Sequence, residues 1–313
     1  MDIIFFGSSD FSVESFKLLA QNYHIAAVIT QPDRRKGRHL HMSRTPVKLF
    51  ALEKGIPVLQ PENVCEAAAI AELKKFKAAL FAVVSFGQKL SQEVLEIPEL
   101  FCVNVHSSLL PRWRGAAPIN RAIMNGDEIT GVSIMKINER MDCGDIILAK
   151  SIPVAADDAV ALFKKLAVLG AQALVEALAM IENGTAAFTP QDEARATVAK
   201  KLKKEDGLID WQDTARNICN KVRGLVPWPC AYTYYKGKFL KILKTGLESD
   251  YAPASHSTLV SGQVIGIEKN KGIIVAAGRD AVCIEQVQLE GKRVMSAHDF
   301  VLGHRLSCGE KLG

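Results

Sequence analysis

The sequence predicts a two-domain protein in which an α/β domain, with helices on both faces of a mostly parallel sheet, precedes a small β-barrel. Its 313 residues suit two domains, or one large one. Apolar runs of strand length alternate with helical stretches through residues 1–187, which is typical of a parallel sheet, and short strand-like segments follow one another after residue 206. Hydrophobic residues make up 48% and charged residues 23%, which excludes extensive disorder.

The first domain begins with a buried strand at 3–6, which is followed by a turn and a helix over 13–19. The same rhythm continues through expected strands at 26–30, 80–84, 102–105 and 132–137, with helices at 64–77 and 118–125. Gly7 stands alone rather than in a GxGxxG motif, so we expect a Rossmann-like sheet without a nicotinamide site. A long helix over 159–183, capped by Asp157 or Asp158, ends the domain.

The second half of the chain has a different rhythm. Residues 188–206 are polar and rich in lysine, and we expect them to link the two domains. The second domain, 207–313, starts with a helix over 213–223, which Pro227 and Pro229 end. Five short strands are expected after it, at 231–235, 239–243, 262–267, 272–277 and 282–288.

The composition indicates a cytoplasmic protein with a polyanionic partner and no metal. The longest apolar run, 78–84, is far shorter than the roughly 20 residues that cross a bilayer, and no cationic segment precedes the first strand. The seven cysteines are widely spaced without CxxC or paired Cys/His spacing, so we expect core thiols rather than disulfides or a zinc site. The net charge is +5, and residues 200–313 carry 18 Lys and Arg against 12 Asp and Glu.

Two polar side chains end the expected strand 102–105. Alternate residues of a strand share a face, so Asn104 and His106 project together while Val103 and Val105 point the other way. Ligands of open α/β sheets bind at the carboxyl ends of the strands, so an amide and a titratable imidazole would share one pocket wall. The alternative is a strand end whose two polar residues reach solvent.

A carboxylate follows the next expected strand, 132–137, in the segment from Met141 to Asp145. If this strand also ends near the pocket, the carboxylate can orient the histidine and favour its charged form. Asp142 and Asp145 are both candidates. Either is also a common turn residue.

The segment directly after His106 is apolar. Leu109 and Leu110, next to Pro111 and to backbone N–H groups, can line a slot for a flat heterocycle. A surface loop in which Trp113 packs on the core is the alternative.

A basic segment follows the second expected strand. Residues 34–52 contain no acidic residue and six basic ones, namely Arg34, Arg35, Lys36, Arg38, Arg44 and Lys48. We expect a long exposed loop, which either binds phosphate groups or is an ordinary solvated face. His39 and His41 alone are weak evidence for a metal site.

These segments together resemble the methionyl-tRNA formyltransferase family, whose members formylate the methionine carried by initiator tRNA. The resemblance spans nearly the whole chain and rests on Thr30 to Arg34 with Gly37 and Arg38, Thr45 to Lys48, Asn104 to His106, Ser108 to Pro111 with Arg114 to Pro118, Asp142 to Asp145, and Pro227 to Pro229. All 10-formyltetrahydrofolate-dependent formyltransferases share the Asn-x-His, SLLP and Asp motifs, which therefore do not name the acceptor. The basic segment and the C-terminal barrel point to tRNA.

The resemblance implies a Rossmann-like catalytic domain, 1–187, and an OB-like tRNA-binding domain, 207–313. It assigns catalysis to Asn104, His106 and Asp142, folate binding to Ser108, Leu109, Leu110 and Pro111, and tRNA binding to Arg34, Arg35, Lys36, Arg38 and Arg44. The formyl donor would be 10-formyltetrahydrofolate, without a metal. The partner would be methionyl initiator tRNA, bound by a monomer that contacts no membrane.

Two other functions fit parts of the pattern. A formyltransferase that acts on an amino-sugar nucleotide would have the same three catalytic residues but no long basic segment after its second strand. A tRNA-binding or folate-sensing protein without turnover would use the polar residues only to bind a ligand. The basic segment favours tRNA as the acceptor.

Overall fold

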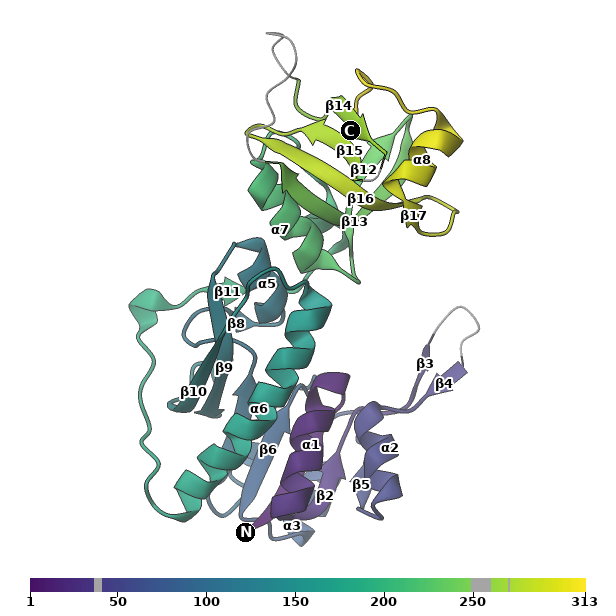
Figure 1. Ribbon diagram of the computed structural model, residues 1–313. Helices are drawn as coiled ribbons and strands as arrows, with labels where there is room; N and C mark the ends of the chain where they lie inside the picture. Colours follow the sequence, from purple (N-terminus) through teal and green to yellow (C-terminus); the bar gives the residue numbers. More distant parts are fainter. Residues whose placement is uncertain (37–40, 249–259, 270) are drawn as a thin grey trace. The chain divides into compact units, whose positions relative to one another are not determined.

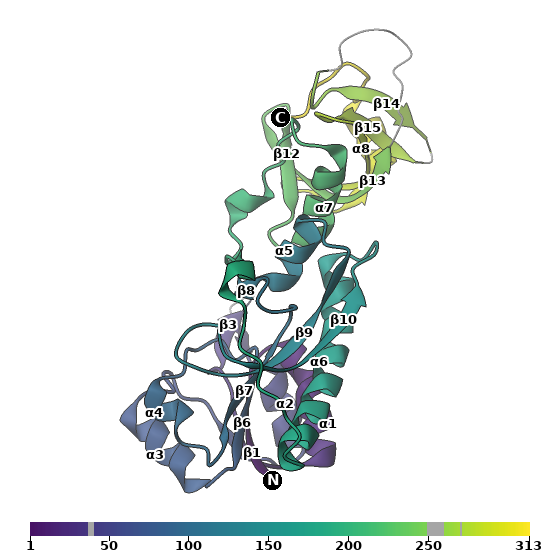
Figure 2. The same ribbon diagram turned by 90° about the vertical axis from the view of Figure 1, so that its left-hand side faces the viewer.

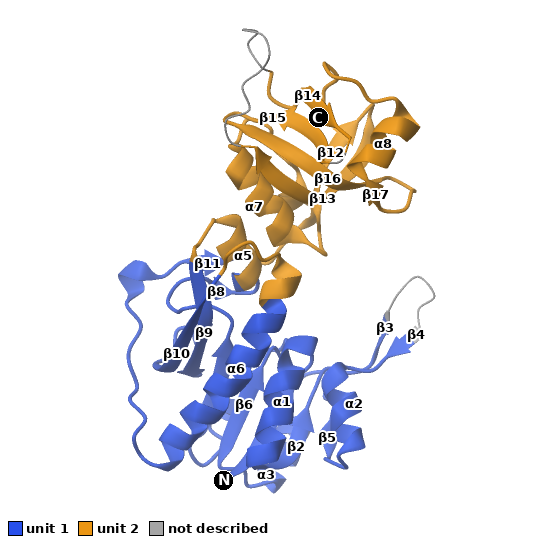
Figure 3. Ribbon diagram, viewed as in Figure 1, with its two compact units in different colours: residues 1–118, 129–153, 163–199 blue, residues 119–128, 154–162, 200–313 orange. Residues whose placement is uncertain are grey.

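The computed structural model describes residues 1–36, 41–248, 260–269 and 271–313. The chain divides into two compact units, which are coloured separately in Figure 3. The first unit comprises residues 1–118, 129–153 and 163–199, and the second comprises residues 119–128, 154–162 and 200–313.

A seven-stranded sheet forms the framework of the first unit (Figures 1 and 2). The strand order is β10-β9-β7-β6-β1-β2-β5. The parallel strands are β1 (Asp2–Gly7), β2 (His24–Ile29), β5 (Val58–Leu59), β6 (Leu80–Val84) and β7 (Phe101–His106). The Rossmann-like, mostly parallel sheet that the sequence predicts is confirmed.

The last two strands depart from the expected parallel rhythm. β9 (Ile129–Lys136) runs antiparallel to β7, and β10 (Ile146–Pro153) runs antiparallel to β9. Between β7 and β9 the regular elements are only β8 (Arg114–Gly115) and the seven-residue helix α5 (Pro118–Met124). A parallel neighbour would need a longer crossover that returns the chain to the start of β7. Without that crossover, β9 starts at the edge of the sheet where β7 ends.

Helices cover both faces of this sheet. α3 (Ala67–Lys75) and α4 (Gln92–Leu95) pack on one face, where their buried side chains join a cluster with those of β1 and β6. On the other face lies α1 (Asp10–Asn22), whose Phe16 stacks on Phe5 with ring centroids 5.0 Å apart. α6 (Ala159–Glu182) covers the same face, and a Cβ on its Gly170 would lie 2.9 Å from Cγ1 of Val105. The backbone of α6 therefore packs closely on β7.

The basic segment after β2 is not the continuous loop that the sequence analysis expected. β3 (Arg34–Lys36) and β4 (His41–Ser43) pair as an antiparallel hairpin, and α2 (Pro46–Glu53) follows. The helix begins at Pro46 because the Thr45 hydroxyl accepts a hydrogen bond from the Lys48 N–H at 3.2 Å. Thr45 and Pro46 together are a helix-start signal, which the sequence analysis missed because it considered only the charges of this segment.

The long helix expected over 159–183 is confirmed as α6, and Asp158 is its cap. The Asp158 carboxylate accepts a hydrogen bond from the Ala161 N–H at 2.8 Å. The chain after α6 is tied to the first unit: Thr189 pairs with Ile146, and β11 (Val198–Ala199) pairs in parallel with β8. Part of the segment expected to be a linker therefore belongs to the packed structure.

An antiparallel sheet forms the second unit and agrees with the expected OB-like domain. Its strands are β12 (Ala231–Tyr235), β13 (Lys238–Glu248), β14 (Val264–Glu268), β15 (Gly272–Ala276), β16 (Ala281–Leu289) and β17 (Met295–Ser296). After residue 200 the helices of this unit are the short 3₁₀ helix η2 (Lys204–Gly207), α7 (Ala215–Leu225) and α8 (Ala297–His304), within the residues that the structure describes. The five expected strands are confirmed, whereas β17 and α8 were not expected.

Two hydrogen bonds illustrate how this unit is held together and why it includes residues from earlier in the chain. The indole N–H of Trp211 donates to the hydroxyl of Thr233 at 3.1 Å inside the core. The Asn120 amide donates to the Gly224 carbonyl at 2.7 Å, which ties α5 to α7. Residues 119–128 therefore pack with the second unit, although they precede β9 in the chain.

The cysteines and other possible metal ligands are scattered. All seven thiols are free, and burial raises the pKa of the Cys102 thiol to about 12, so this group stays neutral at physiological pH. The described part of the chain contains no group of three or more His, Cys, Asp or Glu side chains that could hold a metal ion. No helix in the same residues is long and apolar enough to cross a membrane.

Candidate functional site

β7 ends in the two polar side chains that the sequence analysis singled out. Asn104 and His106 lie two residues apart in this strand and therefore on one face of the sheet. Asn104 is half-buried and His106 is only 6% exposed. His106 is therefore shielded from solvent, whereas Asn104 keeps part of its surface exposed.

Both ring nitrogens of His106 face oxygen atoms. Nε2 lies 2.9 Å from the carbonyl oxygen of Trp113, and because a carbonyl can only accept, Nε2 carries a hydrogen and donates it. Nδ1 lies 3.7 Å from Oδ2 of Asp142. A doubly protonated ring would suit both neighbours, since it has an N–H on each side.

Asp142 reaches the histidine by a route that the sequence did not reveal. β9 is antiparallel to β7, so its carboxyl end lies at the opposite edge of the sheet, and the expectation that strand ends bring the two residues together is wrong. Instead, the loop after β9 folds back, and the Lys136 N–H donates to the Asp145 carbonyl at 2.9 Å. A Cβ on Gly144 would lie 1.6 Å from the Lys136 carbonyl oxygen, so this return requires a glycine.

The structure brings Asp142, rather than Asp145, to the imidazole. Oδ2 of Asp142 accepts a hydrogen bond from the Gly115 N–H at 2.8 Å and faces His106. Asp145 contributes its backbone carbonyl to the pairing with Lys136 instead. The two carboxylates are therefore not equivalent, although the sequence left both open.

The amide of Asn104 is available to a ligand. Its side chain makes no hydrogen bond within the residues that the structure describes. Asn104 is not among the buried side chains that lack a hydrogen-bond partner, so its amide is reached by solvent and is open to a ligand. Its position beside His106 makes a bound substrate the natural partner.

The segment 108–111 is fastened to β9 by a residue that the sequence analysis missed. The fully buried Ser133 hydroxyl accepts from the Leu110 N–H at 3.0 Å and donates to the Ser108 carbonyl at 2.8 Å. Leu109 and Pro111 keep part of their apolar surface exposed. A lone hydroxyl inside the apolar run 132–137 was the only available signal for Ser133.

Backbone groups on either side of Arg114 also face the site. The Arg114 N–H donates to the Thr197 carbonyl at 2.9 Å, and this pairing of β8 with β11 aims the Trp113 carbonyl at the histidine and the Gly115 N–H at Asp142. Gly115 has a φ of 115°, and a Cβ there would lie 2.8 Å from the Ala199 carbonyl oxygen. Only glycine fits this close approach.

Part of the basic segment lies on the β3–β4 hairpin. Arg34, Arg35 and Arg44 are exposed, and the Arg34 guanidinium forms an ion pair with Glu62. Arg38 and the side chain of Lys36, which the resemblance also assigns to tRNA, lie outside the described residues.

Lys48 is not part of an uncompensated positive surface. Its Nζ lies 2.7 Å from Oδ2 of the half-buried Asp33, and the Gln60 amide donates to the other carboxylate oxygen at 2.8 Å. These bonds hold the pKa of Asp33 below its usual value, with Lys48 the larger cause. Arg34 and Lys48 therefore have counter-charges, Glu62 and Asp33, that lie outside the segment, although the segment itself contains no acidic residue.

Comparison with known sequences finds formyl transferases. Residues 1–178 match the formyl transferase family, and residues 201–305 match the formyl transferase C-terminal domain. The methionyl-tRNA formyltransferase of Geobacter metallireducens is 42% identical over 100% of this chain and 99% of its own length. That of Halothermothrix orenii is 43% identical over 100% of both chains.

Solved structures share the fold at lower identity. HypX from Aquifex aeolicus in complex with tetrahydrofolic acid has a TM-score of 0.64 at 19% identity, and the match covers 96% of this chain and 46% of that one. An N-formyltransferase from Helicobacter canadensis, in complex with folinic acid and dTDP-3-aminofucose, has a TM-score of 0.66 at 17% identity. The match covers 90% of this chain and 98% of that one. At these identities the likeness shows the fold alone.

Ser133→Ala is expected to destabilise the protein, because it leaves the Leu110 N–H and the Ser108 carbonyl buried without a partner. Each such group costs about 1–3 kcal/mol, so we expect a loss of at least about 2 kcal/mol in urea denaturation followed by circular dichroism. Ser151→Ala, at an exposed position of β10, is the control and should change stability by less than about 0.5 kcal/mol. Equal transition midpoints for the two variants would contradict the role of Ser133.

Proposed function

The chain belongs to the methionyl-tRNA formyltransferase family, and we propose that it transfers the formyl group of 10-formyltetrahydrofolate to the amino group of methionyl initiator tRNA, for translation initiation. The observation that carries the proposal is the grouping of an unpartnered amide, an imidazole and a carboxylate at the carboxyl end of β7. This grouping lies within the region that matches the formyl transferase family.

The grouping suits the attack of an amine on a formyl carbon. As the methionyl amine adds, the formyl oxygen gains negative charge, and a donor preorganised at that oxygen is worth roughly 3 kcal/mol in a dry site. We assign this donation to Asn104, whose amide has no partner within the described residues, and we propose that protonated His106, whose N–H groups face Trp113 and Asp142, stabilises the oxygen by its positive charge. The formyl carbon then releases the folate nitrogen, which takes up a proton.

Asp142 is assigned one of two roles beside His106. Its carboxylate lies on the Nδ1 side of the ring, so it orients the imidazolium electrostatically. The alternative role is to order a water that carries the proton from the attacking amine to the leaving nitrogen. Both roles require the carboxylate to stay where the Gly115 N–H holds it.

We propose that the segment 108–111 holds the folate, which supplies the formyl group. Leu109 and Pro111 offer partly exposed apolar surface directly after His106 in the chain, while Ser108 and Leu110 are buried and fasten the segment to β9. A flat ring system fits such a surface better than a charged group does. HypX and the Helicobacter canadensis enzyme, which share the fold, are complexes with tetrahydrofolic acid and folinic acid, and this supports a folate as the formyl donor.

The tRNA is proposed to bind the basic segment, which contains the β3–β4 hairpin, and the second unit. Arg34, Arg35 and Arg44 are exposed around the hairpin, and Lys36 and Arg38 belong to the same segment. Residues 200–313 carry 18 basic against 12 acidic side chains, a balance that suits a polyanion. We propose that 1–187 is the catalytic domain, 188–206 the link and 207–313 the tRNA-binding domain of a cytoplasmic monomer.

An amino-sugar nucleotide is the alternative acceptor, because sugar formyltransferases share the fold. The sugar enzyme WlaRD has a TM-score of 0.67 at 18% identity. The relatives named for methionyl-tRNA are more than twice as similar in sequence, at 42% and 43%. The basic hairpin also favours tRNA.

The deciding experiment measures formyl transfer from 10-formyltetrahydrofolate to charged initiator tRNA, with an amino-sugar nucleotide as a second acceptor. Transfer to the tRNA alone supports the proposal. Transfer to the sugar alone supports the alternative. Folate or tRNA binding without transfer to either acceptor would indicate a protein that binds its ligands without turnover.

Asn104→Ala and His106→Ala are each expected to lower kcat by about 10²-fold or more, the usual loss when electrostatic stabilisation of a developing oxyanion is removed. Affinity for tRNA should stay nearly unchanged, because neither side chain belongs to the basic segment. Steady-state kinetics and a tRNA-binding titration check both expectations. Near wild-type turnover in either variant would show that the assigned mechanism is wrong.

Asp142→Asn is expected to lose activity to a similar extent, because the neutral amide no longer presents a negative charge to the ring of His106. Asp145→Asn is the matched control and should lose much less, since Asp145 pairs with Lys136 through its backbone. The measurement is kcat for the two variants under the same conditions. The opposite ranking would mean that the wrong carboxylate has been assigned.

Affinity for tRNA is expected to fall steeply as salt rises, because each phosphate contact releases condensed counterions. Replacing Arg35 and Lys36 together by alanine should flatten the dependence of log affinity on log salt by about one unit per lost contact. Lys17→Gln removes a charge from α1 that is paired with Glu14 at 3.1 Å, and this control should leave the slope unchanged.

Arg38→Ala is expected to weaken the use of tRNA strongly, because Gly37 and Arg38 match the family motif. Folate binding should survive all of these changes, since the segment 108–111 is separate from the basic one. An unchanged salt slope together with unchanged turnover would reduce the basic segment to a solvated insertion and restore the sugar-nucleotide alternative.

A further inference from the structure

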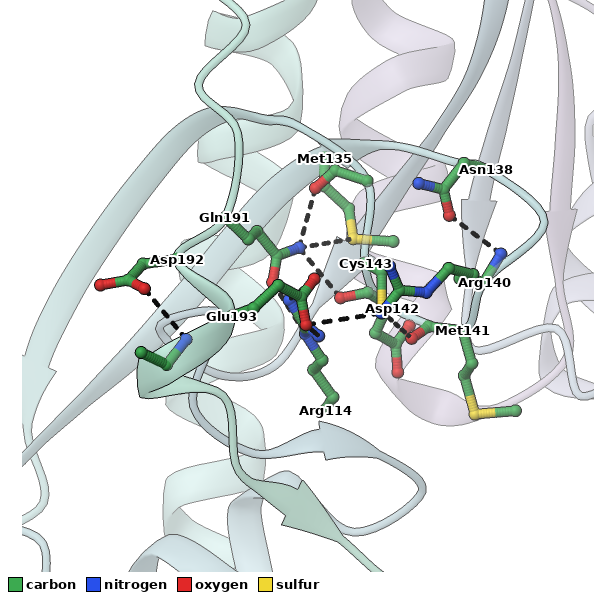
Figure 4. A network of polar contacts seen from close by, with 12 residues as sticks. Arg114, Met135, Asn138, Arg140, Met141, Asp142, Cys143, Gln191, Asp192 and Glu193 are labelled. Atoms are coloured by element: carbon green, nitrogen blue, oxygen red, sulfur yellow. Dashed lines mark hydrogen bonds and ion pairs between the residues drawn. The ribbon is translucent and has the colours of Figure 1, made fainter.

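The loop that carries Asp142 is bonded to a residue that lies beyond the end of α6. The Gln191 amide nitrogen donates to the Asp142 carbonyl at 2.9 Å and to the Gly144 carbonyl at 2.8 Å (Figure 4). These carbonyls lie on either side of Cys143. One side-chain amide therefore holds the tip of the loop at two points.

Arg114 determines which way this amide points. Oε1 of Gln191 accepts a hydrogen bond from Nε of Arg114 at 2.9 Å. A guanidinium can only donate and a carbonyl can only accept. If the Gln191 amide were turned over, its nitrogen would face the Arg114 guanidinium and its oxygen would face the two loop carbonyls, so none of these hydrogen bonds could form. The network therefore admits one orientation of Gln191.

Glu193 completes the network on the far side of Arg114. The two Nη atoms of Arg114 donate to the Glu193 carboxylate at 3.0 and 3.3 Å, and the Arg114 side chain is only 9% exposed. Hydrogen bonding to Arg114 holds the pKa of Glu193 below its usual value. A lowered pKa means that this ion pair is intact above the usual glutamate range and is lost only in more acidic solution.

Asp142 has a backbone conformation that needs such support. Its φ of 53° lies in the left-handed region, which a residue with a side chain rarely adopts and which persists only where the surroundings hold it. Gln191 bonds the carbonyl of Asp142, and the Gly115 N–H bonds its carboxylate at 2.8 Å. Since Gly115 follows Arg114 directly, one connected set of bonds fixes both the backbone and the side chain of Asp142.

We propose that Gln191 is a positioning residue for formyl transfer, which holds Asp142 in the conformation that presents its carboxylate to His106. This inference rests on the proposed catalytic role of Asp142. Gln191 acts through that residue, because its amide is bonded to the loop and to Arg114. The start of the segment that joins the two units is thereby part of the catalytic apparatus.

Gln191→Ala is expected to lower kcat by about 10- to 100-fold, because misplacing a catalytic group slows the reaction. KM for 10-formyltetrahydrofolate should change by less than about twofold, since the segment 108–111 is untouched. Steady-state kinetics on the full chain give both values, and thermal denaturation shows that the variant is folded. A kcat within about twofold of wild type, or a loss carried by KM alone, would overturn the proposal.

Gln191→Glu separates hydrogen-bond donation from packing. The carboxylate keeps the length of the side chain and still accepts from Arg114, but it cannot donate to the two loop carbonyls. We expect a loss of kcat similar to that of Gln191→Ala, and this variant carries the test if the alanine variant does not fold. Wild-type kcat in Gln191→Glu would overturn the proposal.

Asp192→Ala is the matched control from the same segment. The Asp192 carboxylate accepts from the Ala194 N–H at 3.0 Å, at the start of the 3₁₀ helix η1 (Glu193–Arg195), as Figure 4 shows. We expect kcat within about twofold of wild type. A loss as large as that of Gln191→Ala would mean that any disturbance of the segment stops the reaction, and would overturn a specific role for Gln191.

A double variant tests whether Gln191 acts through Asp142. In an Asp142→Asn background, Gln191→Ala should lower kcat by less than about a further twofold, because residues that act as a unit are not additive. If the kcat of the double variant fell by the product of the two single-variant losses, the proposal would be overturned. If the wild type does not formylate tRNA, the proposed function fails, whereas an active wild type with an impaired Asp142→Asn and a fully active Gln191→Ala rejects this inference alone.

Discussion

The direction of β9 relative to β7 is the constraint on which the rest of the site depends. A strand parallel to β7 would have ended at the edge of the sheet where His106 lies, whereas the antiparallel β9 ends at the opposite edge. The following loop must therefore return, and it does so with a glycine packed on the Lys136 carbonyl and a left-handed residue at 142. The close backbone contact and the strained conformation are both consequences of strand direction.

The framework was predictable because burial leaves a periodic trace in the sequence. The strands β1, β6 and β7 and all five expected strands of the second unit lie where apolar runs indicated them. Periodicity reports which segments are buried but not which way they run, so the reversal of β9 could not be read from it. The hairpin and α2 were missed for another reason. The segment was interpreted from its positive charge alone, although Thr45 and Pro46 mark a helix start.

The candidate site was predictable only as far as side-chain chemistry marks it. Asn104 and His106 stand out as polar residues at the end of an apolar run, and a carboxylate near residue 142 was expected, although for the wrong geometric reason. Ser133 and Gln191 were missed because an isolated hydroxyl or amide carries little signal without knowledge of its neighbours. The contacts of the Trp113 carbonyl and the Gly115 N–H could not be predicted from the sequence, because nearly every residue type carries the same backbone groups.

β11 and Gln191 come later in the chain than every strand of the sheet and than the helix α6 that covers it. A ribosome delivers the chain from its N-terminus, so the sheet and its helices can assemble while this segment is still being made. At that stage β8 has no strand beside it and the loop at Asp142 lacks two of its hydrogen bonds. The nascent protein would thus contain a folded sheet before its catalytic site is complete, and formyl transfer would begin only after synthesis has passed β11.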